Sequence, residues 1–130
     1  MIKHLDHLVI TTDKPEQMIA FYTKVLGMHH ETFGDDGFGN PRHALVFGNQ
    51  KINLHQHKKE IHPHAASPTI GAMDLCFIID TDFQTLLTHL KTHHVSPLTD
   101  IVPRTGATGK ISSIYLNDPD GNLIELSTYP

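Results

Sequence analysis

Glu125 is the acidic side chain whose position in this sequence most needs a chemical explanation. It lies in the apolar run Leu123-Ile124-Glu125-Leu126-Ser127, directly after the turn-forming segment Asn117-Asp118-Pro119-Asp120-Gly121-Asn122. The alternation predicts a strand with Glu125 on one face and Ile124 and Leu126 on the other. A carboxylate in such a strand is costly to bury unless it is paired or bound to a metal ion. Because no Lys or Arg lies close to it in the sequence, the pattern favours a catalytic or metal-binding role for Glu125.

The elements that would position Glu125 occur twice along the chain in the same order. The first set is a strand, a helix and three further strands, expected over residues 5–11, 12–27, 28–33, 43–47 and 51–55. The second set repeats this order, expected over residues 73–79, 81–90, 97–102, 111–116 and 123–127. Glycine-rich loops are expected at residues 34–41 and 103–110. The sequence therefore predicts an α+β fold of two tandem βαβββ modules, with an open mixed sheet that lines a cleft.

We expect these modules to form one domain over residues 1–130. Module one covers about residues 1–57, and module two covers about residues 73–130. Residues of about 58–72 are rich in charges, histidines and prolines, which predicts a linker. The length suits a single core of ordinary size.

Aligning the two modules identifies four polar positions that correspond in pairs. His7 near the start of the first strand corresponds to Asp74, and Asn53 near the end of the first module corresponds to Glu125. A pseudo-twofold arrangement of the modules would bring these residues to one cleft. Imidazole and two carboxylates form a ligand set suited to Mn²⁺, Fe²⁺, Co²⁺, Ni²⁺ or Zn²⁺. We therefore predict one divalent metal ion held by His7, Asp74 and Glu125, with open positions for water or substrate.

Four other residues are candidates for binding a substrate. Asn53 is a weak ligand or a hydrogen-bond donor beside the metal, and His55 lies two residues on, so it faces the same way. Arg104 offers a planar fork to a substrate carboxylate, although an ordinary loop arginine is an equal interpretation. Tyr115 lies across from the Glu125 strand, where it would orient a substrate, exchange a proton or pack. Cys76 is expected to be a small core residue.

The composition narrows the classes of partner. The 130 residues include 12 histidines and one cysteine, and the formal net charge is −4 with histidine neutral. Without a basic stripe, nucleic acid and anionic membranes are poor candidates. The single cysteine excludes an internal disulfide and suits a reducing compartment such as the cytoplasm. The histidines between residues 55 and 64 have irregular spacing and do not match a zinc motif.

Three segments carry a resemblance to a known family. They are Asp6-His7-Leu8-Val9-Ile10, Phe21-Tyr22-Thr23-Lys24-Val25-Leu26-Gly27-Met28 and Asp118-Pro119-Asp120-Gly121-Asn122-Leu123-Ile124-Glu125. With them, nearly the whole chain resembles the vicinal oxygen chelate superfamily of glyoxalase I, extradiol dioxygenases, and fosfomycin- and bleomycin-resistance proteins. Residues 47–55 and 103–107 are similar to the small glyoxalase-domain proteins, some of which are labelled virulence-associated.

The resemblance implies a homodimeric, metal-dependent lyase or isomerase, or a dioxygenase, whose small substrate chelates the metal through vicinal oxygens. The family's ligand positions match in residue type at His7 and Glu125. Asp74 stands where members of known chemistry usually have histidine, and Asn53 stands where several have a carboxylate or histidine. These two departures favour the alternative, a metal-free protein that binds and sequesters a small molecule in the manner of bleomycin-resistance proteins.

Overall fold

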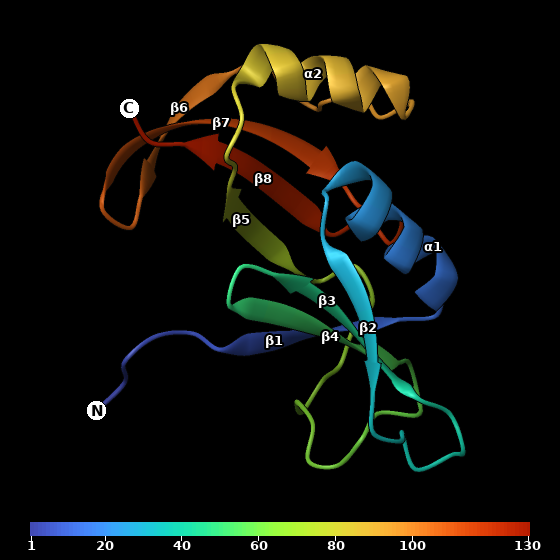
Figure 1. The fold of residues 1–130 in the computed structure, drawn as a ribbon. Helices are drawn as coiled ribbons and strands as arrows, with labels where there is room; N and C mark the ends of the chain where they lie inside the picture. The colour runs from blue at the N-terminus through green and yellow to red at the C-terminus, as the bar shows by residue number, and fades with distance from the viewer. The chain divides into compact units, whose positions relative to one another are not determined.

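The computed structural model describes all residues, 1–130, and contains the expected order of elements twice (Figure 1). The first set comprises β1 (His7–Thr12), α1 (Pro15–Ala20), the π-helical turn η1 (Phe21–Val25), β2 (His29–Phe33), β3 (Arg42–Phe47) and β4 (Gln50–Gln56). The second set comprises β5 (Asp74–Ile78), α2 (Phe83–Thr92), β6 (Val102–Gly106), β7 (Gly109–Asn117) and β8 (Leu123–Thr128). The chain divides into two compact units, unit 1 over residues 1–72 and unit 2 over residues 73–130. The predicted α+β fold of tandem modules is confirmed.

Each unit contains one mixed sheet of four strands with the same topology. The strand orders are β1-β4-β3-β2 and β5-β8-β7-β6, and the first strand of each unit pairs in parallel with the last. His7 pairs with Lys51 in unit 1, as Asp74 pairs with Leu123 in unit 2. Asn53 and Glu125 each lie two residues farther along, so the correspondence inferred from the sequence holds in the register of both sheets.

Short-range chemistry explains where the helices begin and end. The Asp82 carboxylate accepts a 2.7 Å hydrogen bond from the backbone N–H of Thr85 and thereby caps α2. Helix α1 has no side-chain cap, but it begins at Pro15. Proline suits this position because the first N–H groups of a helix have no acceptor within the helix, so the missing N–H costs no hydrogen bond. Gly27 follows η1 with φ +76°, the left-handed conformation that ends a helix most easily when glycine supplies it.

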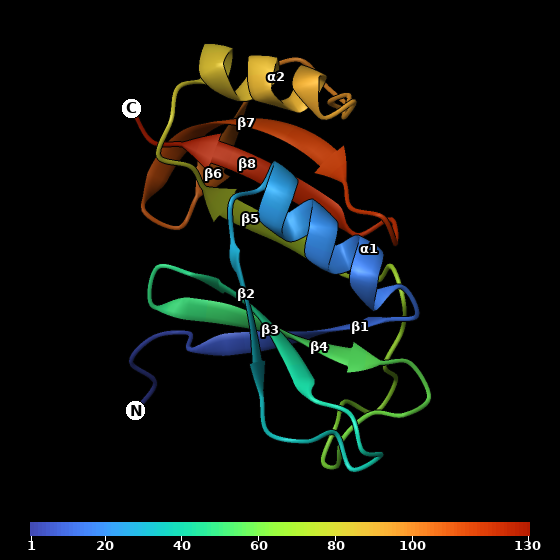
Figure 2. The same ribbon diagram turned by 45° about the vertical axis from the view of Figure 1, so that its right-hand side comes forward.

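Alternation within the strands separates an apolar face from a polar one. In unit 2, Ile124 and Leu126 are at most 2% exposed, whereas Glu125 between them is half-buried. Helix α2 lies along one face of the unit 2 sheet in both ribbon views (Figures 1 and 2), and its Leu86 and Leu90 are buried. No helix in the structure is long and apolar enough to cross a membrane.

The sixth strand differs from the sequence prediction. We expected a strand over residues 97–102 and a flexible loop over 103–110, but β6 covers Val102–Gly106 and forms a tight hairpin with β7. Pro103 and two glycines obscured this strand, because these residues usually interrupt strands. β6 is the edge of its sheet, where a proline is tolerated since one side of the strand needs no ladder hydrogen bonds.

Candidate functional site

Glu125 lies at the middle of the polar face of the unit 2 sheet. Its strand, β8, runs between β5 and β7, so Glu125 has Cys76 as its neighbour on one side and Tyr115 on the other. Directly paired residues in neighbouring strands point to the same face of the sheet. The predicted candidates Glu125 and Tyr115 are therefore brought together, with Asp74 on the same face of β5.

Two serine hydroxyls hold the Glu125 carboxylate. Ser113 Oγ donates to Glu125 Oε2 at 2.7 Å, and Ser127 Oγ lies 3.3 Å from the same oxygen. The two hydroxyls are also 2.7 Å from each other, and both serines are fully buried. Hydrogen bonds to an ionised acceptor are stronger than neutral ones, so this pair offsets part of the cost of desolvating the carboxylate. Because both hydroxyls contact Oε2, they also fix the orientation of Glu125.

The two serines are the functional neighbours that the sequence reasoning missed. A signal for them was present, because Ser127 lies two residues after Glu125 on the same strand face. Ser113 could be placed beside them only through the β7–β8 register, which pairs Ser113 with Ser127.

Cys76 is not a core residue, which corrects the sequence prediction. Its side chain is exposed on the same face as Glu125, and Sγ lies 3.3 Å from Ser127 Oγ. Partial desolvation raises the pKa of the Cys76 thiol, and the negative charge of Glu125 raises it further. The thiol is therefore protonated at neutral pH, a state that disfavours a nucleophilic role.

Arg104 is a strand residue of β6 rather than a loop residue. Its Nε donates to the Tyr115 hydroxyl at 3.0 Å, and Nη1 donates to the carbonyl of Pro103 at 2.8 Å. The guanidinium carbon lies 5.4 Å from the centre of the Tyr115 ring. Arg104 therefore fixes Tyr115 beside Glu125, and only its remaining nitrogen is available to a ligand.

His7 lies on β1, the edge strand of unit 1. Its Nδ1 lies 2.7 Å from Asp6 Oδ1, and about half of its side chain is exposed. The hydrogen bond to His7 is the main cause that lowers the pKa of Asp6. An imidazole whose Nδ1 donates to a carboxylate keeps Nε2 as a free lone pair, the arrangement usual for metal-binding histidines. Asp6 was not singled out from the sequence, although it directly precedes His7.

Asn53 and His55 lie side by side on the same face of β4, as expected from their spacing. They are only 4% and 8% exposed, and neither Asn53 Oδ1 nor His55 Nε2 has a hydrogen-bond partner. Buried polar atoms normally have partners, so these two atoms mark unit 1 as a second region of chemical interest.

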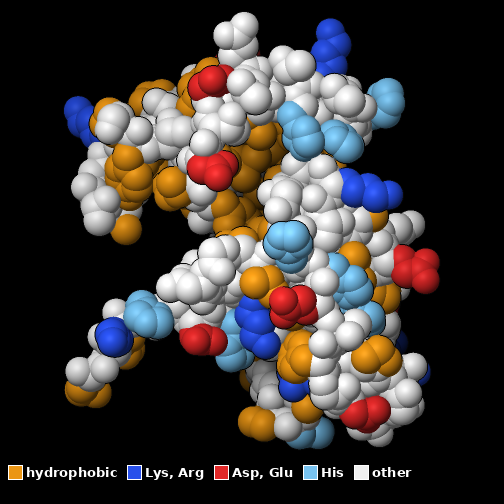
Figure 3. All heavy atoms as spheres, viewed as in Figure 1, with side chains coloured by type: hydrophobic (Ala, Val, Ile, Leu, Met, Phe, Trp, Pro, Cys, Tyr) orange, Lys and Arg blue, Asp and Glu red, His pale blue; other side chains and the backbone are white.

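Six of the other ten histidines form three pairs. His30 Nε2 lies 2.9 Å from His43 Nδ1, and ring contacts join His62 with His64 and His89 with His93. Histidine side chains lie at several separate places on the visible surface (Figure 3). The structure contains no group of three or more His, Cys, Asp and Glu side chains close enough to hold a metal ion.

Comparisons with known proteins place this geometry in context. The family model described as "Glyoxalase/Bleomycin resistance protein/Dioxygenase superfamily" matches residues 4–126. Virulence protein STM3117 of Salmonella typhimurium is 46% identical over 129 residues, which cover 99% of this chain and 86% of that protein. Its crystal structure superposes with a TM-score of 0.92 over 100% of this chain and 99% of that one. The glyoxalase domain-containing protein RDO1 of Mycosarcoma maydis is 48% identical, over 98% of this chain and 69% of that protein.

More distant structures share the fold alone. A lactoylglutathione lyase from Agrobacterium tumefaciens has a TM-score of 0.72 at 19% identity, covering 98% of this chain and 94% of that one. TnmS3, an antibiotic binding protein from Streptomyces, has a TM-score of 0.69 at 18% identity, covering 99% of this chain and 98% of that one. One fold thus supports both a lyase and a binding protein.

Proposed function

This chain belongs to the Glyoxalase/Bleomycin resistance protein/Dioxygenase superfamily, and from that premise we propose that it is a divalent-metal-dependent enzyme. Its substrate would be a small molecule that presents two adjacent oxygens to the metal. The observation that carries the proposal is the Glu125 carboxylate, which two buried serine hydroxyls hold in one orientation on a polar sheet face. Such support for a single acidic side chain is typical of a ligand or a catalytic group.

Three residues have the donor chemistry that a metal ion needs. Glu125 and Asp74 supply carboxylates from one sheet face, and His7 supplies an imidazole whose Nδ1 is engaged by Asp6. This set of one nitrogen and two oxygen donors suits Mn²⁺, Fe²⁺, Co²⁺, Ni²⁺ or Zn²⁺. A bound divalent ion would supply Lewis-acid chemistry to the chelated oxygens.

The protein's own residues would orient the substrate and move protons. Glu125 is the candidate for taking up or returning a proton, since both serine hydroxyls that hold it contact Oε2 rather than Oε1. Tyr115 would position the substrate with its hydroxyl, whose own orientation is set by Arg104 Nε. The remaining nitrogen of Arg104 would bind an anionic group, and Asn53 and His55 would contact polar substrate atoms from unit 1.

A second candidate function is metal-free binding of a small molecule. Asn53, a neutral amide, occupies the position in unit 1 that Glu125 occupies in unit 2, and one oxygen of Glu125 is already hydrogen-bonded. TnmS3 is described as an antibiotic binding protein, so a binding function is compatible with this fold. In either case we propose that the protein is a homodimer and that it is located in the cytoplasm. Light scattering of the purified protein measures the oligomeric state.

Metal content tests the proposal directly. Untagged protein purified without chelators should contain about one equivalent of a transition metal by plasma mass spectrometry, with Glu125→Ala and His7→Ala losing it. Glu16→Ala, which removes an exposed carboxylate from α1, is the matched control and should keep the metal. The identity of the metal then selects lyase and isomerase assays or dioxygenase assays. A wild-type protein without metal, and without a thermal shift on adding any of the five ions, would refute the enzyme proposal and favour ligand sequestration.

A further inference from the structure

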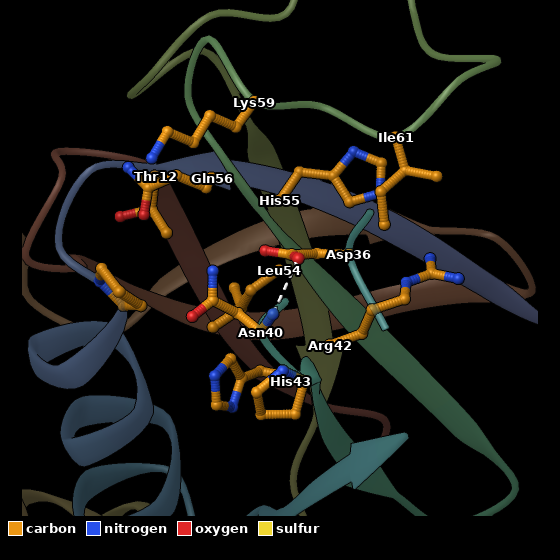
Figure 4. Close-up of a pocket in the computed structure, with 12 residues that line it drawn as sticks. Thr12, Asp36, Asn40, Arg42, His43, Leu54, His55, Gln56, Lys59 and Ile61 are labelled. Atoms are coloured by element: carbon orange, nitrogen blue, oxygen red, sulfur yellow. Dashed lines mark hydrogen bonds between the residues drawn. The ribbon is translucent and has the colours of Figure 1, made fainter. Parts of the chain in front are cut away.

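Unit 1 contains a pocket whose lining residues, apart from His55, have no part in the proposed reaction. Its volume is about 300 Å³, and it lies at the end of the sheet where β1 and β4 finish and β3 begins. The loop over residues 34–41 and the segment after β4 complete its wall. The lining side chains that matter here are Asp36, Asn40, Arg42, His55 and Lys59 (Figure 4).

Arg42 and His55 are the chemically unsatisfied members of this wall. His55 is only 8% exposed and its Nε2 has no partner, and the buried Nε of Arg42 also has none. Both side chains lie on the same side of the pocket, opposite Thr12 and Gln56 (Figure 4). The Arg42 guanidinium is stacked 4.6 Å from the centre of the Phe33 ring, which fixes its plane without using its N–H groups.

The repeat explains why these two groups lack a partner. The register of β3 and β4 pairs His43 with Leu54, so Arg42 faces His55 in the positions that Ser113 and Ser127 occupy in unit 2. In unit 2 that pair is hydrogen-bonded to the Glu125 carboxylate. In unit 1 the counterpart of Glu125 is Asn53, which offers no negative charge. Arg42 and His55, which are larger donors than the two serines, therefore have no carboxylate of the protein to bind.

The charges around the pocket favour an anion. Arg42 and Lys59 are two cations among the lining residues, and Asp36 is the only acid among them. Burial opposes ionisation of Asp36, but backbone N–H groups of Phe38 and Asn40 donate to its Oδ1 and lower its pKa. Those hydrogen bonds engage Asp36 with its own loop. With Arg42 and Lys59 positive and Asp36 negative, these lining residues have a net charge of +1, which attracts an anionic ligand.

Burial lowers the pKa of His55, and the positive charge of Arg42 lowers it further. Glu60 acts in the opposite direction and His64 acts in the same direction as Arg42. The ring is therefore neutral at pH 7, and a neutral imidazole still presents one N–H. A guanidinium and an imidazole N–H on one wall suit an oxyanion, because both donate to oxygen.

We propose that unit 1 binds a small molecule through an oxyanion, either a carboxylate or a phosphate, held between Arg42 and His55. The site lies wholly within residues 12–61, so it does not depend on the metal or on Glu125. In unit 1 the oxyanion of the ligand would take the place that the Glu125 carboxylate has in unit 2.

Calorimetric titration of the full chain with L-lactate and, separately, with inorganic phosphate tests the site. We expect saturable binding of at least one probe with a Kd of about 1 mM, as is usual for ligands of few atoms. Arg42→Gln should weaken binding about 10-fold or more, since it removes a charge-assisted donor. Lys24→Gln removes an exposed charge elsewhere in unit 1 and should change the affinity less than about twofold. The probe that binds more tightly identifies the ligand class.

Two further measurements separate binding from folding. Lys59→Gln alters an exposed side chain and should weaken binding about twofold to threefold without loss of structure. In proton NMR, a saturating probe should raise the pKa of His55, because an adjacent anion stabilises the imidazolium. Lack of saturation with both probes, or equal affinity in wild type and a folded Arg42→Gln variant, would overturn the proposal. Metal loading in Arg42→Gln should remain at the wild-type level, so failure here is distinct from failure of the enzyme proposal.

Discussion

The two units share a backbone plan but use their polar faces differently. Ile52 and Ile124 occupy equivalent positions on the apolar faces, and both are fully buried. One residue farther along, unit 1 has Asn53, a neutral and almost wholly buried amide, whereas unit 2 has the half-buried acid Glu125. The apolar faces are constrained by packing in both units. The polar faces also contain buried side chains, but these are polar, and each unit carries a different set of donors and acceptors on the same scaffold.

The strongest test of this comparison concerns the apolar faces. Ile52→Ala and Ile124→Ala should each lower the free energy of unfolding of their own unit by about 3 kcal/mol, since each leaves a cavity in a packed core. Urea denaturation measures both changes, with the exposed Ile2→Ala as a control that should cost less than about 0.5 kcal/mol. A cost below about 1 kcal/mol for only one of the two isoleucines would show that the cores are not equivalent.

A smaller effect is expected from the hydroxyls that support Glu125. Ser113→Ala should lower stability by about 1 kcal/mol, because it removes a 2.7 Å hydrogen bond to a partly exposed carboxylate. A double-mutant cycle with Glu125→Gln, followed by urea denaturation, measures the coupling. Ser112→Ala, which alters an exposed side chain that points away from Glu125, should be close to neutral. Additive effects of Ser113→Ala and Glu125→Gln would mean that this hydrogen bond does not contribute to the polar face of unit 2.

The smallest effect concerns the thiol beside Glu125. Since desolvation and the Glu125 charge raise the pKa of Cys76, the thiolate fraction at pH 7 is low and alkylation by iodoacetamide should be slow. The rate should rise about tenfold per pH unit below that pKa, and Glu125→Gln should increase the rate at pH 7 a fewfold. Val9 is the counterpart of Cys76 in unit 1, beside the neutral Asn53. Val9→Cys in a Cys76→Ser background should therefore react faster than Cys76, and a slower reaction would contradict the electrostatic explanation.

The fold could be predicted because its signals are local and repeated. The alternation around Ile124, the Asp82 cap and the helix end at Gly27 each specify their element within a few residues. The error at β6 had a physical cause, since Pro103 is compatible with a strand only at a sheet edge and edge status is a tertiary property. The assignment of Cys76 to the core failed for a related reason, because a small apolar residue in a strand can face either side.

The candidate site was predictable only in its individual residues. The alternation singled out Glu125, the expected strand order placed Tyr115 across from it, and the repeat related Asn53 to Glu125. The sheet register confirms these positions, while the roles of the residues stay predictions. The support of Glu125 by Ser113 depends on pairing between strands, which single-strand patterns do not encode. Arg42, whose Nε has no hydrogen-bond partner, likewise became informative only when the register placed it beside His55 on the neighbouring strand.

The parallel pairing of first and last strands has a consequence for the order of folding. Hairpins such as β3–β4 join residues close in sequence, whereas pairing His7 with Lys51 closes a separation of 44 residues (51 − 7). Long closures carry a larger entropy cost, so β1 and β5 should add last to sheets that the hairpins have begun. These two strands are also edges, paired on one side only, and should be among the first to detach in the native state. The proposed metal ligands His7 and Asp74 lie at the starts of these two strands, so transient release of either strand would free one proposed ligand.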